Sequence, residues 1–151
     1  MNKFFQELKK EHKEVQDILD RLTGMKSGSS SKMDDLFQKL KVEIVPHMKA
    51  EEKVFYPSLE KKSGEAREPA LEGFEEHHVA ELVLSELDEM DMSEDHWAPK
   101  MKVLKELIEH HVQEEESEIF ESAEKVLKSN DFDMILSKFE EEKQRIKQSM
   151  A

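Results

Sequence analysis

The sequence of 151 residues contains no cysteine. Disulfide bonds, iron–sulfur clusters and zinc sites with thiolate ligands are therefore excluded. The absence of cysteine also fits a protein of a reducing compartment. Basic residues are the minority charge, with 23 Lys and Arg against 36 Asp and Glu and a formal net charge of −13. This balance argues against nucleic acid or an anionic membrane surface as a partner and favours cations.

Long apolar runs are also missing. No uninterrupted stretch approaches the length of a membrane span, and the apolar run at the N-terminus is too short for a signal peptide. We therefore expect a soluble, cytoplasmic protein with no membrane partner.

Glycine and proline are scarce, with four of each, while Glu, Lys and Leu are abundant. This composition predicts an almost entirely helical chain. The breaks fall at residues 24–31, 62–68, 91–95 and 128–131. The predicted helices are residues 3–23, 32–61, 69–90, 96–127 and 132–148.

Apolar residues recur at alternating spacings of three and four along each predicted helix, as on one face of a helix. Short connections favour an antiparallel up-down-up-down four-helix bundle, so the fold class is all-α. We expect this bundle to be one domain over residues 1–127. The additional C-terminal helix, within residues 128–151, should pack on the bundle or on a partner subunit, which leaves a monomer or a homodimer open.

The most informative pattern is a short segment that occurs twice. His47 and Glu51 recur 64 positions later as His111 and Glu115, and the apolar residues upstream repeat at the same offset. In each copy the two side chains are four residues apart, so they lie on one face of a helix. They occupy positions where the apolar stripe should continue.

The earlier parts of the two copies also match, because Glu11-His12 returns as Glu76-His77 at an offset of 65. The chain is thus two copies of a helical hairpin, and an antiparallel bundle brings their polar clusters to a common level. Buried imidazoles and carboxylates cost free energy unless something satisfies them, as a bound metal ion does. We therefore predict a site for two metal ions with the ligands His12, His47, Glu51, His77, His111 and Glu115.

Four imidazoles and two carboxylates suit iron, with manganese or zinc possible, because carboxylates bridge two cations while imidazoles cap each one. Soft copper(I) is disfavoured by the lack of thiolate. Any one of these histidines alone is more often a solvated or core side chain, and a lone His-x-x-x-Glu is more often a surface pair. Their joint occurrence on four apolar stripes favours metal binding.

Several neighbours need separate interpretation. Glu81 lies one turn beyond His77 and is a less certain ligand, with surface placement favoured. Glu52 and Glu116 are expected in solvent or against the ligands, and Glu116 is an alternative bridge if the helix register differs. Tyr56 is expected to pack in the core rather than to serve a redox role. The other histidines should lie at the bundle edge or in solvent: His78, His96 and His110.

These residues give the chain a resemblance to the hemerythrin-like, or HHE cation-binding, domain proteins. It rests on Glu11-His12, on residues 45–57, on Glu76-His77-His78 and on residues 110–120, and covers about residues 3–125. The resemblance implies a four-helix bundle that holds an oxo- or hydroxo-bridged non-haem di-iron centre. The family includes dioxygen carriers, sensors of oxygen or iron, and proteins of nitric oxide or oxidative-stress responses.

The sequence is more similar to the bacterial proteins of this family than to the respiratory carriers. Oxygen-carrying hemerythrins have a fifth histidine ligand where this sequence has Glu81. Their last carboxylate is typically an aspartate five residues after its histidine, whereas Glu115 comes four after His111.

The expected function is a di-iron protein that binds dioxygen, nitric oxide or iron for sensing, storage or stress response. The alternatives are a di-iron enzyme with peroxide, nitric oxide or oxidase activity, and a metal-free bundle whose acidic face binds a partner.

Overall fold

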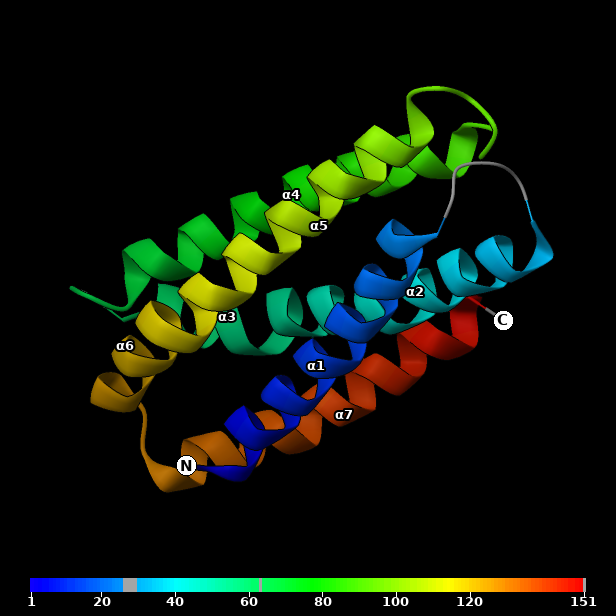
Figure 1. Ribbon diagram of the computed structural model, residues 1–151. Coiled ribbons are helices and arrows are strands. Elements are labelled where there is room, and N and C mark those ends of the chain that lie inside the picture. Colours follow the sequence, from blue (N-terminus) through cyan, green and yellow to red (C-terminus); the bar gives the residue numbers. More distant parts are fainter. Residues whose placement is uncertain (26–29, 63, 151) are drawn as a thin grey trace.

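The structure, a computed structural model, describes residues 1–25, 30–62 and 64–150, and it contains helices and no strand in these ranges (Figure 1). The predicted all-α class is confirmed. The elements are α1 (Lys3–Gly24), α2 (Ser31–Ala50), the π-helical turn η1 (Glu51–Phe55), α3 (Tyr56–Glu60), α4 (Arg67–Glu89), α5 (Trp97–Glu114), the π-helical turn η2 (Glu115–Ile119), α6 (Phe120–Val126) and α7 (Ser129–Met150).

The first eight elements form the four rods of an antiparallel bundle. One rod is α1, the second runs from α2 through η1 to α3, the third is α4, and the fourth runs from α5 through η2 to α6. The α1 rod packs against α2 and α5, and α4 packs against α3 and α5. The predicted four-helix bundle is therefore confirmed.

The added C-terminal helix α7 lies along α1, α2 and η1, on the side of the bundle away from α4 and α5 (Figure 1). It begins three residues before its predicted start. Its buried face carries Phe132, Ile135 and Phe139. The helix thus covers one side of the bundle, over the start of α1.

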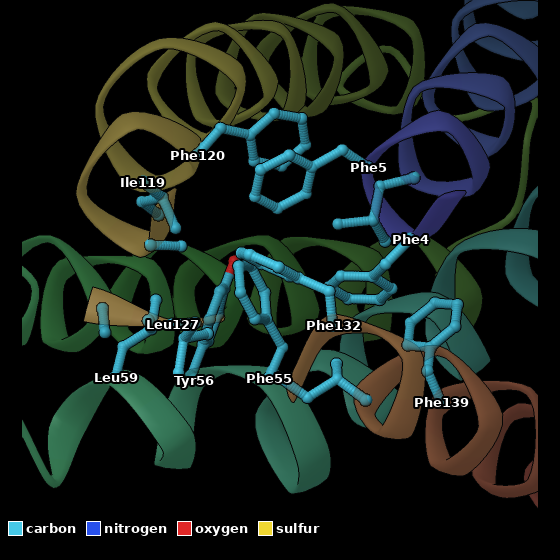
Figure 2. Packing of buried hydrophobic residues seen from close by; sticks show 14 of the residues in the cluster. Phe4, Phe5, Phe55, Tyr56, Leu59, Ile119, Phe120, Leu127, Phe132 and Phe139 are labelled. Atoms are coloured by element: carbon cyan, nitrogen blue, oxygen red, sulfur yellow. The ribbon is translucent and has the colours of Figure 1, made fainter. Parts of the chain in front are cut away.

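Two apolar clusters fill the bundle and leave a polar layer between them. The first includes Phe4, Phe5, Phe55 and Phe120, together with the buried face of α7. Figure 2 shows the rings of Phe5 and Phe120 lying face to face, with centroids 3.9 Å apart. The second cluster lies at the other end of the rods, around the buried Trp97. Because each rod contributes to both clusters, its middle residues are held at the level of the polar layer.

Side-chain caps fix two of the helix starts. The amide oxygen of Asn2 accepts a hydrogen bond from the backbone N–H of Phe5, and the hydroxyl oxygen of Ser30 accepts one from that of Met33. The predicted connections at 24–31 and 62–68 lie partly outside the described residues. Within the described ranges, no helix is long and apolar enough to cross a membrane.

Candidate metal centre

A π-helical turn follows each copy of the His-x-x-x-Glu motif. Glu51 is the first residue of η1 and Glu115 is the first residue of η2. The backbone N–H groups of Tyr56 and Phe120 donate to the carbonyls of Glu51 and Glu115 respectively, five residues earlier. Each turn therefore holds one residue more than an α-helical turn, and the aromatic residue lies one turn beyond the glutamate. Both segments were predicted as continuous α-helix, and the two π-helical turns are a difference from that prediction.

The structure brings all six predicted ligands together at the polar layer. His12 and His47, here called half A, form one group with Glu51 and Glu115. His77 and His111, here called half B, form a second group with the same two glutamates. In each group the potential ligand atoms lie within 4.8 Å of one another. Glu51 and Glu115, the shared carboxylates, are fully buried.

The Nε2 atoms of the four rings face the shared carboxylates. The distances are 3.0 Å from His12 to Glu115, 3.2 Å from His47 to Glu51, 3.3 Å from His77 to Glu51 and 3.7 Å from His111 to Glu115. In half B the two Nε2 atoms are also only 3.0 Å from each other. The nitrogens of both halves thus converge on one interior space.

The Nδ1 atoms of the same rings face outward, each to its own carboxylate. These outer carboxylates and their distances are Glu116 to His12 at 2.7 Å, Glu11 to His47 at 2.9 Å, Glu52 to His77 at 2.8 Å and Glu76 to His111 at 2.6 Å. An ionised carboxylate only accepts, so each Nδ1–H donates and the Nε2 of a neutral ring keeps its lone pair for the interior. Metal-ligating histidines are oriented in this way.

Several polar atoms of the site are buried without a hydrogen-bond partner. They are Nε2 of His12, both carboxylate oxygens of Glu51 and Oε1 of Glu115. Buried polar atoms are normally paired, since an unpaired one costs about 1–3 kcal/mol. In half B the Nδ1–H groups of both rings already donate to outer carboxylates, so two neutral rings would have Nε2 lone pairs facing each other at 3.0 Å. A cation at the centre of each group would bind the unpartnered oxygen and nitrogen atoms and would separate the facing nitrogens. The donor set therefore fits two bound metal ions.

The surroundings of the two shared carboxylates move their pKa values in opposite directions. Burial and the negative charge of Glu115 raise the pKa of Glu51 well above its usual value. Burial acts on Glu115 in the same direction, but the neighbouring carboxyl of Glu51 and imidazole of His12 outweigh it and hold the pKa of Glu115 well below its usual value. The pair therefore shares one proton when no metal is present.

Tyr56 is buried in the first apolar cluster, as expected, and its hydroxyl also reaches the site. Its hydroxyl donates a short hydrogen bond to Glu115 and lies 3.2 Å from Nε2 of His111 and 3.4 Å from Nε2 of His77. Burial raises the pKa of this phenol well above 10, as do the charges of Glu115 and Glu51, so it keeps its proton.

Gly73 makes room for the tyrosine. A Cβ at this position in α4 would lie 2.9–3.1 Å from three atoms of the Tyr56 side chain.

Glu81, the less certain predicted ligand, belongs to neither group. It is half-buried and pairs with Lys49 at 3.1 Å. His78, His96 and His110 are exposed.

Glu11, Glu76 and Lys143 were not among the residues for which the sequence predicted a role. The repeat held a signal for the first two, because both glutamates directly precede a histidine at matching positions.

A small cavity of about 20 Å³ borders the histidines of both halves. The side chains that line it, besides those of the site, are apolar: Val15, Ile44, Met48, Ala80, Ile108 and Val112. A cavity of this volume holds about one water molecule. Space beside the centre is therefore limited to a very small molecule.

Comparisons with known proteins agree with this geometry. The family model described as the hemerythrin HHE cation binding domain matches residues 3–123. A crystal structure of a hemerythrin HHE cation binding domain-containing protein from Mycobacterium kansasii superposes with a TM-score of 0.82 and 21% sequence identity, over 99% of this chain and 89% of that one. At this level of identity the superposition establishes the shared fold.

A curated relative, a DNA nickase from Nostoc sp., is 22% identical over 143 residues. The match covers 95% of this chain but 40% of the nickase, so this chain spans less than half of that protein's length. The name of that relative, a DNA nickase, describes the relative.

The bundle and its histidine and glutamate groups thus define a cation-binding helical protein. The chain belongs to the hemerythrin HHE cation-binding domain family.

Proposed function

We propose that the protein holds a dinuclear non-haem iron centre and binds dioxygen, nitric oxide or iron itself, in sensing, storage or stress response. The observation that carries this proposal is the pair of four-residue groups that share Glu51 and Glu115. Carboxylates that belong to two groups at once are suited to bridge two cations, while two imidazoles complete each group. The proposed ligands are therefore the six residues that the sequence predicted.

Iron is the proposed metal because the donors are imidazole nitrogens and carboxylate oxygens. These ligand types suit iron(II), and they also accept manganese or zinc. When bound, the metal ions supply Lewis acidity and an open coordination position. The outer carboxylates orient the four imidazoles and raise their basicity through the Nδ1–H bonds. A reducing cytoplasm, as the cysteine-free sequence predicts, is the setting in which ferrous iron is available for loading.

The small apolar cavity beside the histidines supports a very small exogenous ligand. Its volume of about 20 Å³ and its lining by side chains such as Ile44, Met48 and Ile108 suit dioxygen or nitric oxide. The apolar lining also keeps bulk water from the site. Binding without turnover is therefore the main proposal.

An enzymatic role is the second proposal, and the hydroxyl of Tyr56 is the observation that favours it. This phenol keeps its proton and lies within hydrogen-bond distance of Glu115 and of both rings of half B. A proton held at this place can be passed to a reacting oxygen, as turnover of peroxide requires. Peroxide, nitric oxide or oxidase chemistry would use it.

The metal is tested on protein purified without added metal or chelator. We expect elemental analysis to find about two iron atoms per chain, one for each group. We also expect chelation to lower the melting temperature, because a metal that binds only the folded state stabilises it. A protein free of metal whose melting temperature is unchanged by iron or by a chelator would overturn the proposal.

Binding and turnover are separated by mixing the reduced, iron-loaded protein with dioxygen, nitric oxide or peroxide. A stable adduct that is released when the gas is removed supports the binding role. Continuous consumption of peroxide that is in large excess over the protein supports the enzymatic role and overturns the first proposal. The matched variant is Tyr56→Phe, which should slow consumption and leave the iron content unchanged.

A further inference from the structure

Lys143 is a buried lysine that α7 places against one of the outer carboxylates. Its side chain is 9% exposed, and its Nζ lies 2.5 Å from Oε2 of Glu11. Glu7 and Glu140 lie farther away, at 3.7 and 3.6 Å. A buried ammonium group is costly unless it is paired. The close pairing with Glu11 is therefore the interaction that keeps this lysine inside the protein.

The same glutamate holds a proposed metal ligand through its other oxygen. Oε1 of Glu11 accepts the hydrogen bond from Nδ1 of His47, at 2.9 Å. Phe139, one helical turn before Lys143 on α7, packs edge-on to the ring of His47, with centroids 5.8 Å apart. The helix α7 thus contacts half A in two ways. The ammonium group of Lys143 binds Glu11, which binds His47, and the ring of Phe139 packs directly on His47.

Within the described ranges, no lysine takes the corresponding place in half B. Glu76, the counterpart of Glu11 in the repeat, holds His111 at 2.6 Å, but its side chain is 23% exposed and its other oxygen faces the exposed His110 at 3.6 Å. Among the described residues, no lysine or arginine pairs with the remaining outer carboxylates, Glu52 and Glu116. The helix α7 lies outside the hairpin repeat and beyond residues 3–123 of the family match.

We propose that Lys143 is a positioning residue for half A: it holds Glu11 in place, and through Glu11 it fixes His47, so that the two metal positions are not equivalent. This inference rests on the proposed dinuclear centre. A carboxylate that bonds to the outer nitrogen of a ligating imidazole orients the ring and tunes its basicity. A carboxylate clamped from its far side by an ammonium holds the ring more rigidly than one that faces solvent.

The test is a stepwise anaerobic titration of the metal-free protein with ferrous iron, repeated with cobalt(II), whose visible bands report the ligand geometry. The variant is Lys143→Met, which keeps the length of the side chain. We expect one of the two binding steps to weaken by about 10- to 100-fold, as for other outer partners of metal ligands. The other step should change by less than about twofold. The cobalt spectrum should change for the affected ion alone.

Two further variants separate positioning from packing. Lys143→Arg keeps the charge and should restore the weakened step, whereas Lys138→Met, at an exposed position of the same helix, should change neither step. If Lys143→Met does not fold, the double variant Glu11→Gln with Lys143→Met leaves no buried charge unpaired, and it should weaken the same single step.

The results also separate this inference from the proposed function. Two ions in the wild-type protein and unchanged steps in Lys143→Met would overturn the role of Lys143 alone. Equal weakening of both steps would do the same, because it shows a general loss of structure. A wild-type protein that binds no iron and no cobalt would overturn the proposed function, and this inference with it.

Discussion

Half A and half B of the centre arise from the same repeated hairpin, yet their surroundings differ. Each half has two imidazoles, two outer carboxylates and both shared carboxylates. Half B also has the hydroxyl of Tyr56, whereas Phe120, the counterpart of this tyrosine in the repeat, stacks on Phe5. Half A instead has the lysine of α7 behind one of its outer carboxylates.

The sequence repeat thus places the histidines and shared glutamates of both halves, while residues that do not repeat make the halves different. A proton donor beside one position and a fixed positive charge behind the other would give the two proposed metal ions different environments. Such a difference suits a centre in which one ion binds an exogenous ligand and the other supports it.

The largest effect is expected from a shared carboxylate, because both halves depend on it. Glu51→Gln keeps the volume of the side chain but removes the charge that a bridge between two cations needs. We expect the iron content to fall from about two atoms per chain to near zero, as measured by elemental analysis. The control is Glu43→Gln, on the same rod but outside both groups, which should keep the wild-type content.

Loss of one histidine should affect one half only. His47→Ala removes a ligand of half A and His111→Ala removes one of half B, so each variant should keep about one tightly bound iron atom per chain. The two variants are compared by elemental analysis after dialysis against a weak chelator. Wild-type iron content in either variant would contradict the assignment of that histidine.

An outer carboxylate should have a smaller effect, confined to its own half. Glu76→Gln weakens the hydrogen bond that holds His111, and we expect one binding step to weaken by about 10- to 100-fold. Isothermal titration with ferrous iron measures both steps. Glu72→Gln, an exposed position one turn earlier on α4, is the matched control and should leave both steps unchanged.

A side chain added next to Tyr56 should lower the free energy of unfolding by a small amount. Gly73→Ala places a methyl group against Tyr56, at a cost of about 1–3 kcal/mol for overpacking, and the better helix propensity of alanine returns about 1 kcal/mol. A net loss of about 1 kcal/mol in urea unfolding is expected. Gly24→Ala, where a Cβ meets nothing within 4 Å, should be neutral or stabilising.

The smallest expected effect is the pH dependence of the metal-free protein. Burial lowers the pKa of His12, but the carboxylates of Glu115 and Glu116, 3.0 and 2.7 Å from its ring nitrogens, outweigh it and raise this pKa to about 9. Because the unfolded value is about 6.5, protonated His12 contributes its full stability below pH 6.5, and this contribution is lost as the pH rises through 9.

Urea unfolding of the chelated protein at pH 6.5, 8 and 9.5 measures this loss. His12→Gln removes the titrating group and should show a weaker decline. A chelated wild-type protein with constant stability over this range would contradict the assigned cause.

The fold, and the meeting of the six predicted ligands in one layer, could be predicted from the sequence because both depend on helical periodicity. Residues four apart share a face, and an apolar stripe interrupted by His and Glu marks the face that turns inward. A repeat of that pattern in two hairpins places the interruptions at one level. The outer carboxylates could be predicted only in part. Each is adjacent in sequence to a predicted ligand, but the sequence does not indicate which histidine it binds.

The sequence by itself determined the all-α bundle, its repeat and the polar layer, because these are set by local spacing along each helix. Only the tertiary structure decided that Tyr56 enters half B and that Lys143 reaches Glu11 across 132 residues. The first depends on a π-helical turn and the space left by Gly73, and the second on how α7 docks. Neither contact follows a periodic pattern, because each joins elements whose relative position is fixed by packing.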